Sequence, residues 1–94
     1  MATPEGQIRD YLLSRCKHFN LTAYKLNFEN RRGAPDWMVL GMGKHIFVEL
    51  KSEDGKLSRQ QEAVIDSMRL IGGCKVFVCA YQDEVDFALE ELFV

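Results

Sequence analysis

The 94-residue sequence predicts an α/β domain in which helices flank a mixed central sheet, with the element order α-β-β-β-α-β-α. Three observations support this fold class. Apolar residues recur at helical spacing in three segments, residues 3–18, 59–71 and 83–93. Two apolar runs, residues 37–40 and 45–50, flank a Gly-Met-Gly-Lys turn and have the composition of a β-hairpin. Two further strand-like runs complete the sheet, residues 22–28 and 74–80.

Capping signals delimit the predicted helices. Thr3 is in position to cap the first helix, and Pro4 suits its first helical residue. Ser58 fits the N-cap of the second helix, which ends before the Gly72-Gly73 pair. The third helix is amphipathic, and its buried stripe is expected to consist of Val85, Ala88, Leu89 and Leu92.

The strands differ in how much of each is expected to be covered. In residues 22–28, Tyr24, Leu26 and Phe28 alternate with polar neighbours, as in a strand with one buried face. Residues 37–40 and 45–50 are apolar on both faces, which predicts central strands covered on both sides.

Length and composition restrict the class of protein. A core rarely divides below about 100 residues, so we expect a single domain spanning residues 1–94. The content of 47% hydrophobic and 28% charged residues excludes a disordered or membrane-embedded class. No apolar run is long enough to span a bilayer. The N-terminal residues lack the basic start and apolar stretch of a signal peptide, so we expect a cytoplasmic protein.

Charge and cysteine content argue against a generally polyanion-binding surface and against a disulfide or zinc-stabilised fold. The net charge of -2 gives no general attraction to a polyanion, so any contact with nucleic acid needs a local cluster of basic residues. Cys16, Cys74 and Cys79 show neither CxxC spacing nor paired histidines, which argues against a disulfide framework and a structural zinc site. We expect them to be buried as small apolar side chains.

Asp36, Glu49 and Lys51 form the most informative group. If Met42 and Gly43 are the two turn residues of the hairpin, Asp36 falls opposite Glu49, and opposed residues point to the same face. Two facing carboxylates repel each other but suit a divalent cation, since Mg²⁺ takes hard oxygen ligands. The strand period of two places Lys51 on this face and turns Leu50 toward the core.

This combination suits phosphodiester hydrolysis. The reaction requires a water made nucleophilic near neutral pH, which a bound metal ion supplies, and stabilisation of charge on the phosphoryl oxygens. The ammonium group of Lys51 would orient that water or neutralise the developing negative charge.

Three motifs together resemble a known nuclease family. Gly-Ala-Pro-Asp at residues 33–36 and Glu-Leu-Lys at 49–51 resemble the PD-(D/E)XK nuclease signature. Gly-Lys-Leu-Ser-Arg-Gln-Gln at residues 55–61 resembles its VRR-NUC branch, the virus-type replication-repair nuclease domain. The resemblance covers nearly the whole chain and implies a restriction-endonuclease-like core.

The resemblance also implies a site and a reaction. A Mg²⁺ or Mn²⁺ ion would be held by Asp36, Glu49 and the backbone carbonyl of Leu50, with Lys51 catalytic and Gln61 facing the site. Glu5 matches a helix-one glutamate that often joins the site in this family. The implied activity is that of a DNA endonuclease, directed at structured DNA such as four-way junctions, in phage or bacterial replication and repair.

The DNA contacts and the oligomeric state are expectations of the same kind. Arg31 and Arg32 precede the signature loop and are candidates for backbone phosphate contacts, as are Lys56 and Arg59. A small acidic domain offers little surface for a branched duplex, so we expect a homodimer with two sites. The apolar C-terminal residues Phe87, Leu89, Leu92, Phe93 and Val94 favour such an interface.

Several of these assignments have a structural alternative. Asp36, Glu49 and Lys51 can form a surface charge cluster, and Gln61 can be a solvated helix residue. Glu5 also suits the helix dipole. The basic residues, with Lys25 and Lys44, can be solvated cations, and the last helix can simply cover the sheet. At the level of function, the alternative to an enzyme is a catalytically idle DNA-binding or assembly module on the same fold.

Overall fold

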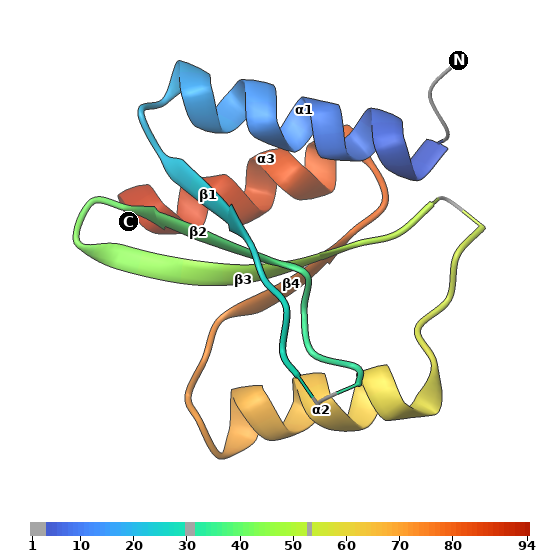
Figure 1. Ribbon diagram of the computed structural model, residues 1–94. Coiled ribbons are helices and arrows are strands. Elements are labelled where there is room, and N and C mark those ends of the chain that lie inside the picture. The colour runs from blue at the N-terminus through green and yellow to red at the C-terminus, as the bar shows by residue number, and fades with distance from the viewer. Residues whose placement is uncertain (1–3, 30–31, 53) are drawn as a thin grey trace.

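A four-stranded mixed sheet forms the centre of the structure (Figure 1). The computed structural model describes residues 4–29, 32–52 and 54–94. The strand order is β1-β2-β3-β4, with β1 antiparallel to β2, β2 antiparallel to β3, and β3 parallel to β4. The strands span Thr22–Lys25, Trp37–Gly41, Lys44–Leu50 and Val76–Cys79.

Helices cover both faces of this sheet. They are α1 (Pro4–His18), α2 (Arg59–Leu70) and α3 (Gln82–Glu90), and a short 3-10 helix, η1 (Glu91–Phe93), follows α3. Figure 1 shows α1 and α3 side by side on one face and α2 on the other. The predicted α/β class and element order are therefore confirmed. No described helix has the length and apolar character needed to cross a membrane.

The β2–β3 hairpin has the predicted register. Met42 and Gly43 have φ angles of 56° and 74°, and two positive φ values at the turn are typical of type I′. Gly41 pairs with Lys44, and the pairing continues to Trp37 opposite Val48. Asp36 and Glu49 lie one position beyond the last of these pairs.

Alternate residues of the central strands build the main core. Val39, Ile46, Val48 and Leu50 are 0–2% exposed and lie in one cluster with buried residues of the neighbouring helices, including Leu12, Cys16, Val85, Ala88, Leu89 and Leu92. On the opposite face, where α2 lies, Ile65 and Val76 are buried. Side chains at the intervening β3 positions, Phe47 and Glu49, therefore point toward the α2 side.

The cysteines behave largely as expected. All three are free thiols, Cys16 and Cys79 are buried, and Cys74 is half-buried. Burial raises the pKa of Cys16 to about 11 and that of Cys79 to about 12. These two thiols therefore stay protonated at neutral pH and act as small apolar side chains.

The prediction for the first strand is wrong in its length and in which face is buried. The strand ends at Lys25, although the N–H of Leu26 still donates to the carbonyl of Asp36 at 2.7 Å. Tyr24 and Phe28 are 51% and 43% exposed rather than buried. The reason is that β1 is an edge strand, and the core lies against the face that carries Ala23.

Other element ends shift by a few residues. The fourth strand is shorter than residues 74–80, and the predicted last helix divides into α3 and η1. Thr3, the expected cap of the first helix, lies outside the described residues. Leu89 and Leu92 are 2% and 1% exposed, so they cannot form the expected apolar surface at the C-terminus. They are required in the core beneath α3 and η1.

Candidate functional site

Glu49 and Lys51 lie at the C-terminal end of β3. Among the described residues, Glu49 is the charged residue that is buried, with 3% of its surface exposed. The N–H of Lys51 donates to the carbonyl of Cys79 at 2.9 Å, so the pairing with β4 continues one residue past the strand. Leu50, between them, points into the core and is 2% exposed.

Gln61 of α2 completes a polar network with these two residues. The Lys51 ammonium nitrogen donates to Gln61 Oε1 at 3.0 Å and lies 3.7 Å from Glu49 Oε2. Gln61 Nε2 donates to the same Glu49 oxygen at 3.2 Å. The structure thus brings together three of the residues that the sequence assigned to the site, from two separate elements.

The cap of α2 fixes the orientation of the Gln61 amide. Ser58 and Gln61 form a capping box: the Ser58 N–H donates to Gln61 Oε1 at 2.9 Å, and the Gln61 N–H donates to Ser58 Oγ at 3.0 Å. Oε1 therefore accepts from both Ser58 and Lys51. The Nε2 group is left to face Glu49.

The loop that carries the Gly-Ala-Pro-Asp motif rests on the first turn of α2. Gly33 has a φ of +91°, and a Cβ atom there would lie 2.8 Å from the carbonyl oxygen of Gln60. Pro35 is fully buried. A glycine at this position lets the loop that leads to Asp36, the residue before β2, approach α2 closely.

Asp36 is half-buried and pairs with a lysine from β1. Its Oδ2 lies 3.6 Å from Lys25 Nζ, and that ammonium also lies 5.3 Å from the centre of the Trp37 ring. From the sequence alone, Lys25 was one of the basic residues that could contact DNA or be solvated, and no contact with Asp36 was predicted. The β1–β2 pairing sets Lys25 opposite Trp37, which accounts for its place over that ring, and the path of the loop between the two strands brings Asp36 to the same ammonium.

Glu49 is in an unfavourable environment for a carboxylate. Burial raises its pKa most, the negative charge of Asp36 raises it further, and Lys51 and the backbone amide of Asp36 lower it. Glu49 Oε1 is buried and accepts no hydrogen bond of good geometry from the described part of the chain. A buried acceptor left in this way is costly to the fold and is a place where a cation would be favourable.

The donor set fits a hard divalent cation. Asp36 and Glu49 offer carboxylate oxygens, and Leu50 offers a backbone carbonyl between Glu49 and Lys51. The described residues contain no cluster of three or more histidine, cysteine, aspartate or glutamate side chains placed to hold a metal ion. The remaining ligands would be water and substrate, which is the usual situation for Mg²⁺.

Glu5 lies in the first turn of α1 and acts on the site through its charge. It is exposed, and its carboxylate raises the pKa of Glu49 by a smaller amount than burial or Asp36 does. The effect is one of charge alone and assigns Glu5 no contact in the site. It is equally compatible with a favourable interaction between Glu5 and the helix dipole.

Three of the four basic residues assigned to DNA are exposed. Arg32, Lys56 and Arg59 have no ion-pair partner among the described residues. Arg32 precedes the signature loop, and the other two flank the start of α2. Arg31 lies outside the described residues.

Comparison with known proteins identifies the fold. No protein-family model matches the chain, and no curated protein matches it significantly. A solved structure described as a VRR_NUC domain superposes with a TM-score of 0.83 and is 35% identical in sequence. The match covers 95% of this chain and 97% of that one. With this identity over nearly the full length of both chains, the protein belongs to the VRR-NUC family and has its nuclease fold.

Proposed function

We propose that this protein is a Mg²⁺- or Mn²⁺-dependent endonuclease that hydrolyses phosphodiester bonds in DNA, with branched DNA such as a four-way junction as its substrate. The observation that carries the proposal is the environment of Glu49. Its carboxylate is buried, is near enough to Asp36 to be affected by its charge, and has one oxygen that accepts no hydrogen bond of good geometry from the described chain. A stable fold would avoid this arrangement unless a cation is to be bound there.

Asp36, Glu49 and the carbonyl of Leu50 are the groups that would hold the metal ion. When bound, a divalent ion lowers the pKa of its water and polarises the phosphoryl oxygens. The chain's own contribution is to fix the ligands. Gln61 donates to Glu49 Oε2, which leaves the other oxygen, Oε1, for the ion.

Lys51 is placed to act on the substrate. An ammonium group has three N–H donors. Gln61 Oε1 accepts one of them, and Glu49 Oε2 lies beyond hydrogen-bond distance at 3.7 Å, which leaves donors for a phosphoryl oxygen or an attacking water. The side chain is 20% exposed, so a substrate at the end of β3 can reach it.

Arg32, Lys56 and Arg59 supply the local positive charge that an acidic protein needs to bind DNA. They flank the signature loop and the N-terminus of α2, next to Gln61. Contacts from these residues to backbone phosphates would position the duplex without reading its sequence.

A homodimer would present two such sites to the two equivalent strands of a junction. Phe87, Phe93 and Val94 remain 59%, 47% and 80% exposed near the C-terminus, and this apolar surface supports a C₂ interface.

The proposal is tested by incubating the purified protein with supercoiled plasmid and with a four-way junction, in Mg²⁺, in Mn²⁺ and in EDTA. We expect cleavage in either metal, faster on the junction, and none in EDTA. Cleavage in EDTA would overturn the metal dependence. DNA binding without cleavage in any metal would identify the protein as an idle binding module.

A further inference from the structure

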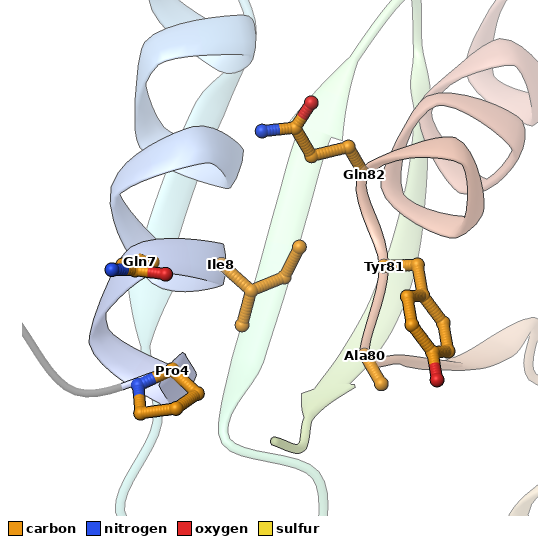
Figure 2. A pocket seen from close by; sticks show the side chains of 6 residues that line it. All are labelled: Pro4, Gln7, Ile8, Ala80, Tyr81 and Gln82. Carbon is orange, nitrogen blue, oxygen red and sulfur yellow. The ribbon is translucent and has the colours of Figure 1, made fainter. Parts of the chain in front are cut away.

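A cavity of about 170 Å³ lies between the start of α1 and the connection from β4 to α3. Figure 2 shows the six residues that line it: Pro4, Gln7, Ile8, Ala80, Tyr81 and Gln82. The side chains of Ile8 and Gln82 project into the space between the two elements, whereas the Tyr81 ring points to the outer side of the connection. The cavity is several times larger than one water molecule needs.

Both walls of this cavity are adjacent in the chain to residues that act on the charged site. On the α1 side, Pro4 precedes Glu5, whose charge acts on Glu49. On the β4 side, Ala80 follows Cys79, whose carbonyl accepts the N–H of Lys51. Because β3 and β4 are parallel, the cavity lies at the same end of the sheet as Glu49 and Lys51, on the side covered by α1 and α3.

The lining combines apolar side chains with two primary amides and carries no charge. Ile8 is 5% exposed and forms an apolar wall, together with Pro4 and Ala80. Within the described chain, the side-chain amides of Gln7 and Gln82 have no hydrogen-bond partner. Each amide offers both donors and an acceptor.

These features select the chemical class of ligand. A phosphate would need a cation, and a metal ion would need a carboxylate, and neither is present among the lining residues. A flat neutral ring with hydrogen-bonding edges matches apolar walls and glutamine amides, which pair with nucleobase edges.

We propose that this cavity receives an unpaired nucleobase of the cleaved strand, from a nucleotide next to the scissile phosphate, with Gln82 and Gln7 contacting its edge. The inference rests on the proposed nuclease function. It assigns to the same site a preference for DNA in which a base next to the cut is free to leave the stack, as at a branch point.

The first test compares cleavage of junctions that carry a normal or an abasic nucleotide at each position flanking the cut. For the wild-type protein, we expect an abasic residue at one flanking position to slow cleavage about five- to tenfold, the effect of losing one or two such contacts. In Gln82→Ala this penalty should largely disappear, because the contact is already lost. Gln60→Ala, an exposed glutamine outside the cavity, should keep the full penalty.

A second test does not depend on cleavage. The side-chain amide NMR signals of Gln7 and Gln82 should shift on titration with deoxyadenosine or thymidine, and should not shift with inorganic phosphate. Equal cleavage of normal and abasic junctions, or amide signals that no nucleoside moves, would overturn the proposal. Amide shifts in a protein that cuts no DNA would support the cavity assignment and refute the nuclease function.

Discussion

At the residue scale, Glu49 carries most of the electrostatic strain of the site. Its pKa is raised because burial and the charge of Asp36 outweigh the favourable effect of Lys51. A carboxyl group whose pKa is raised on folding destabilises the native state once it ionises. The cost is absent below the pKa of the unfolded chain, near 4.5, and is complete above the raised folded value.

Replacement of Glu49 by glutamine should therefore stabilise the metal-free protein at neutral pH. The amide keeps the volume and removes the buried charge, so the cost of ionising this group in the folded state is no longer present. Thermal unfolding in EDTA should show a higher midpoint for Glu49→Gln at pH 7, and the difference should shrink toward pH 4.5. A difference that stays constant with pH would mean that Glu49 is not strained by its charge.

Substitution of Lys51 should lower the cleavage rate without lowering the affinity for metal ions. We expect Lys51→Ala to lower the single-turnover rate by roughly 10²–10³-fold, because it removes a charged donor from the transition state. Affinity for Mn²⁺ should hold or rise, since a positive charge 3.7 Å from Glu49 is lost. Calorimetry and single-turnover kinetics on the same preparation decide the matter. Loss of metal binding with an unchanged rate at saturating metal would make Lys51 structural.

At the scale of elements, the cap of α2 connects helix formation to the site. Ser58 orients Gln61, and Gln61 holds Lys51 and Glu49. Ser58→Ala should cost about 1 kcal/mol of stability as an ordinary lost cap. It should also lower kcat about tenfold with KM unchanged, the size seen when an outer partner of a metal ligand is removed.

Two variants separate this positioning role from general destabilisation. Ser58→Thr keeps the cap and should restore kcat, whereas Ser67→Ala, an exposed serine later in α2, should leave kcat and KM as they are. A kcat for Ser58→Ala equal to wild type would show that Gln61 is oriented without the cap.

Local signals in the sequence were sufficient for much of this architecture. The Met42-Gly43 turn fixes the register of the hairpin by its backbone preference alone, and Asp36 and Glu49 lie one position beyond its last pair. Ser58 and Gln61 are three residues apart, so the capping box is also a local feature.

Features that depend on distant parts of the chain were not predictable in the same way. The alternation in residues 22–28 is that of a half-buried strand, but only the tertiary structure shows that Tyr24 faces solvent. The Lys25–Asp36 ion pair depends on how the loop between β1 and β2 closes. The cavity beside the site joins residues near both ends of the chain, which no spacing rule connects.

At the scale of the whole molecule, the proposed dimer is supported by only a few exposed apolar residues. Burial of Leu89 and Leu92 leaves Phe87, Phe93 and Val94 as the exposed apolar residues near the C-terminus, with Phe87 beside Phe77 and Phe93 beside Phe19. Phe87→Ser should weaken the dimer without unfolding the protein, because its side chain is 59% exposed. Light scattering behind a sizing column, at micromolar concentrations with and without junction DNA, measures the mass. A monomer throughout, together with efficient junction cutting, would rule the dimer out.

The central claim is that Asp36 and Glu49 hold the metal ion that cleavage requires. The most direct measurement is the single-turnover rate of junction cleavage at saturating Mg²⁺ for Asp36→Asn, beside wild type and Asp66→Asn, an exposed aspartate on α2. The account predicts a loss of at least about 100-fold in Asp36→Asn, because the charge that holds the cation is removed at constant volume, and none in Asp66→Asn. A folded Asp36→Asn protein that cuts the junction at the wild-type rate would contradict it.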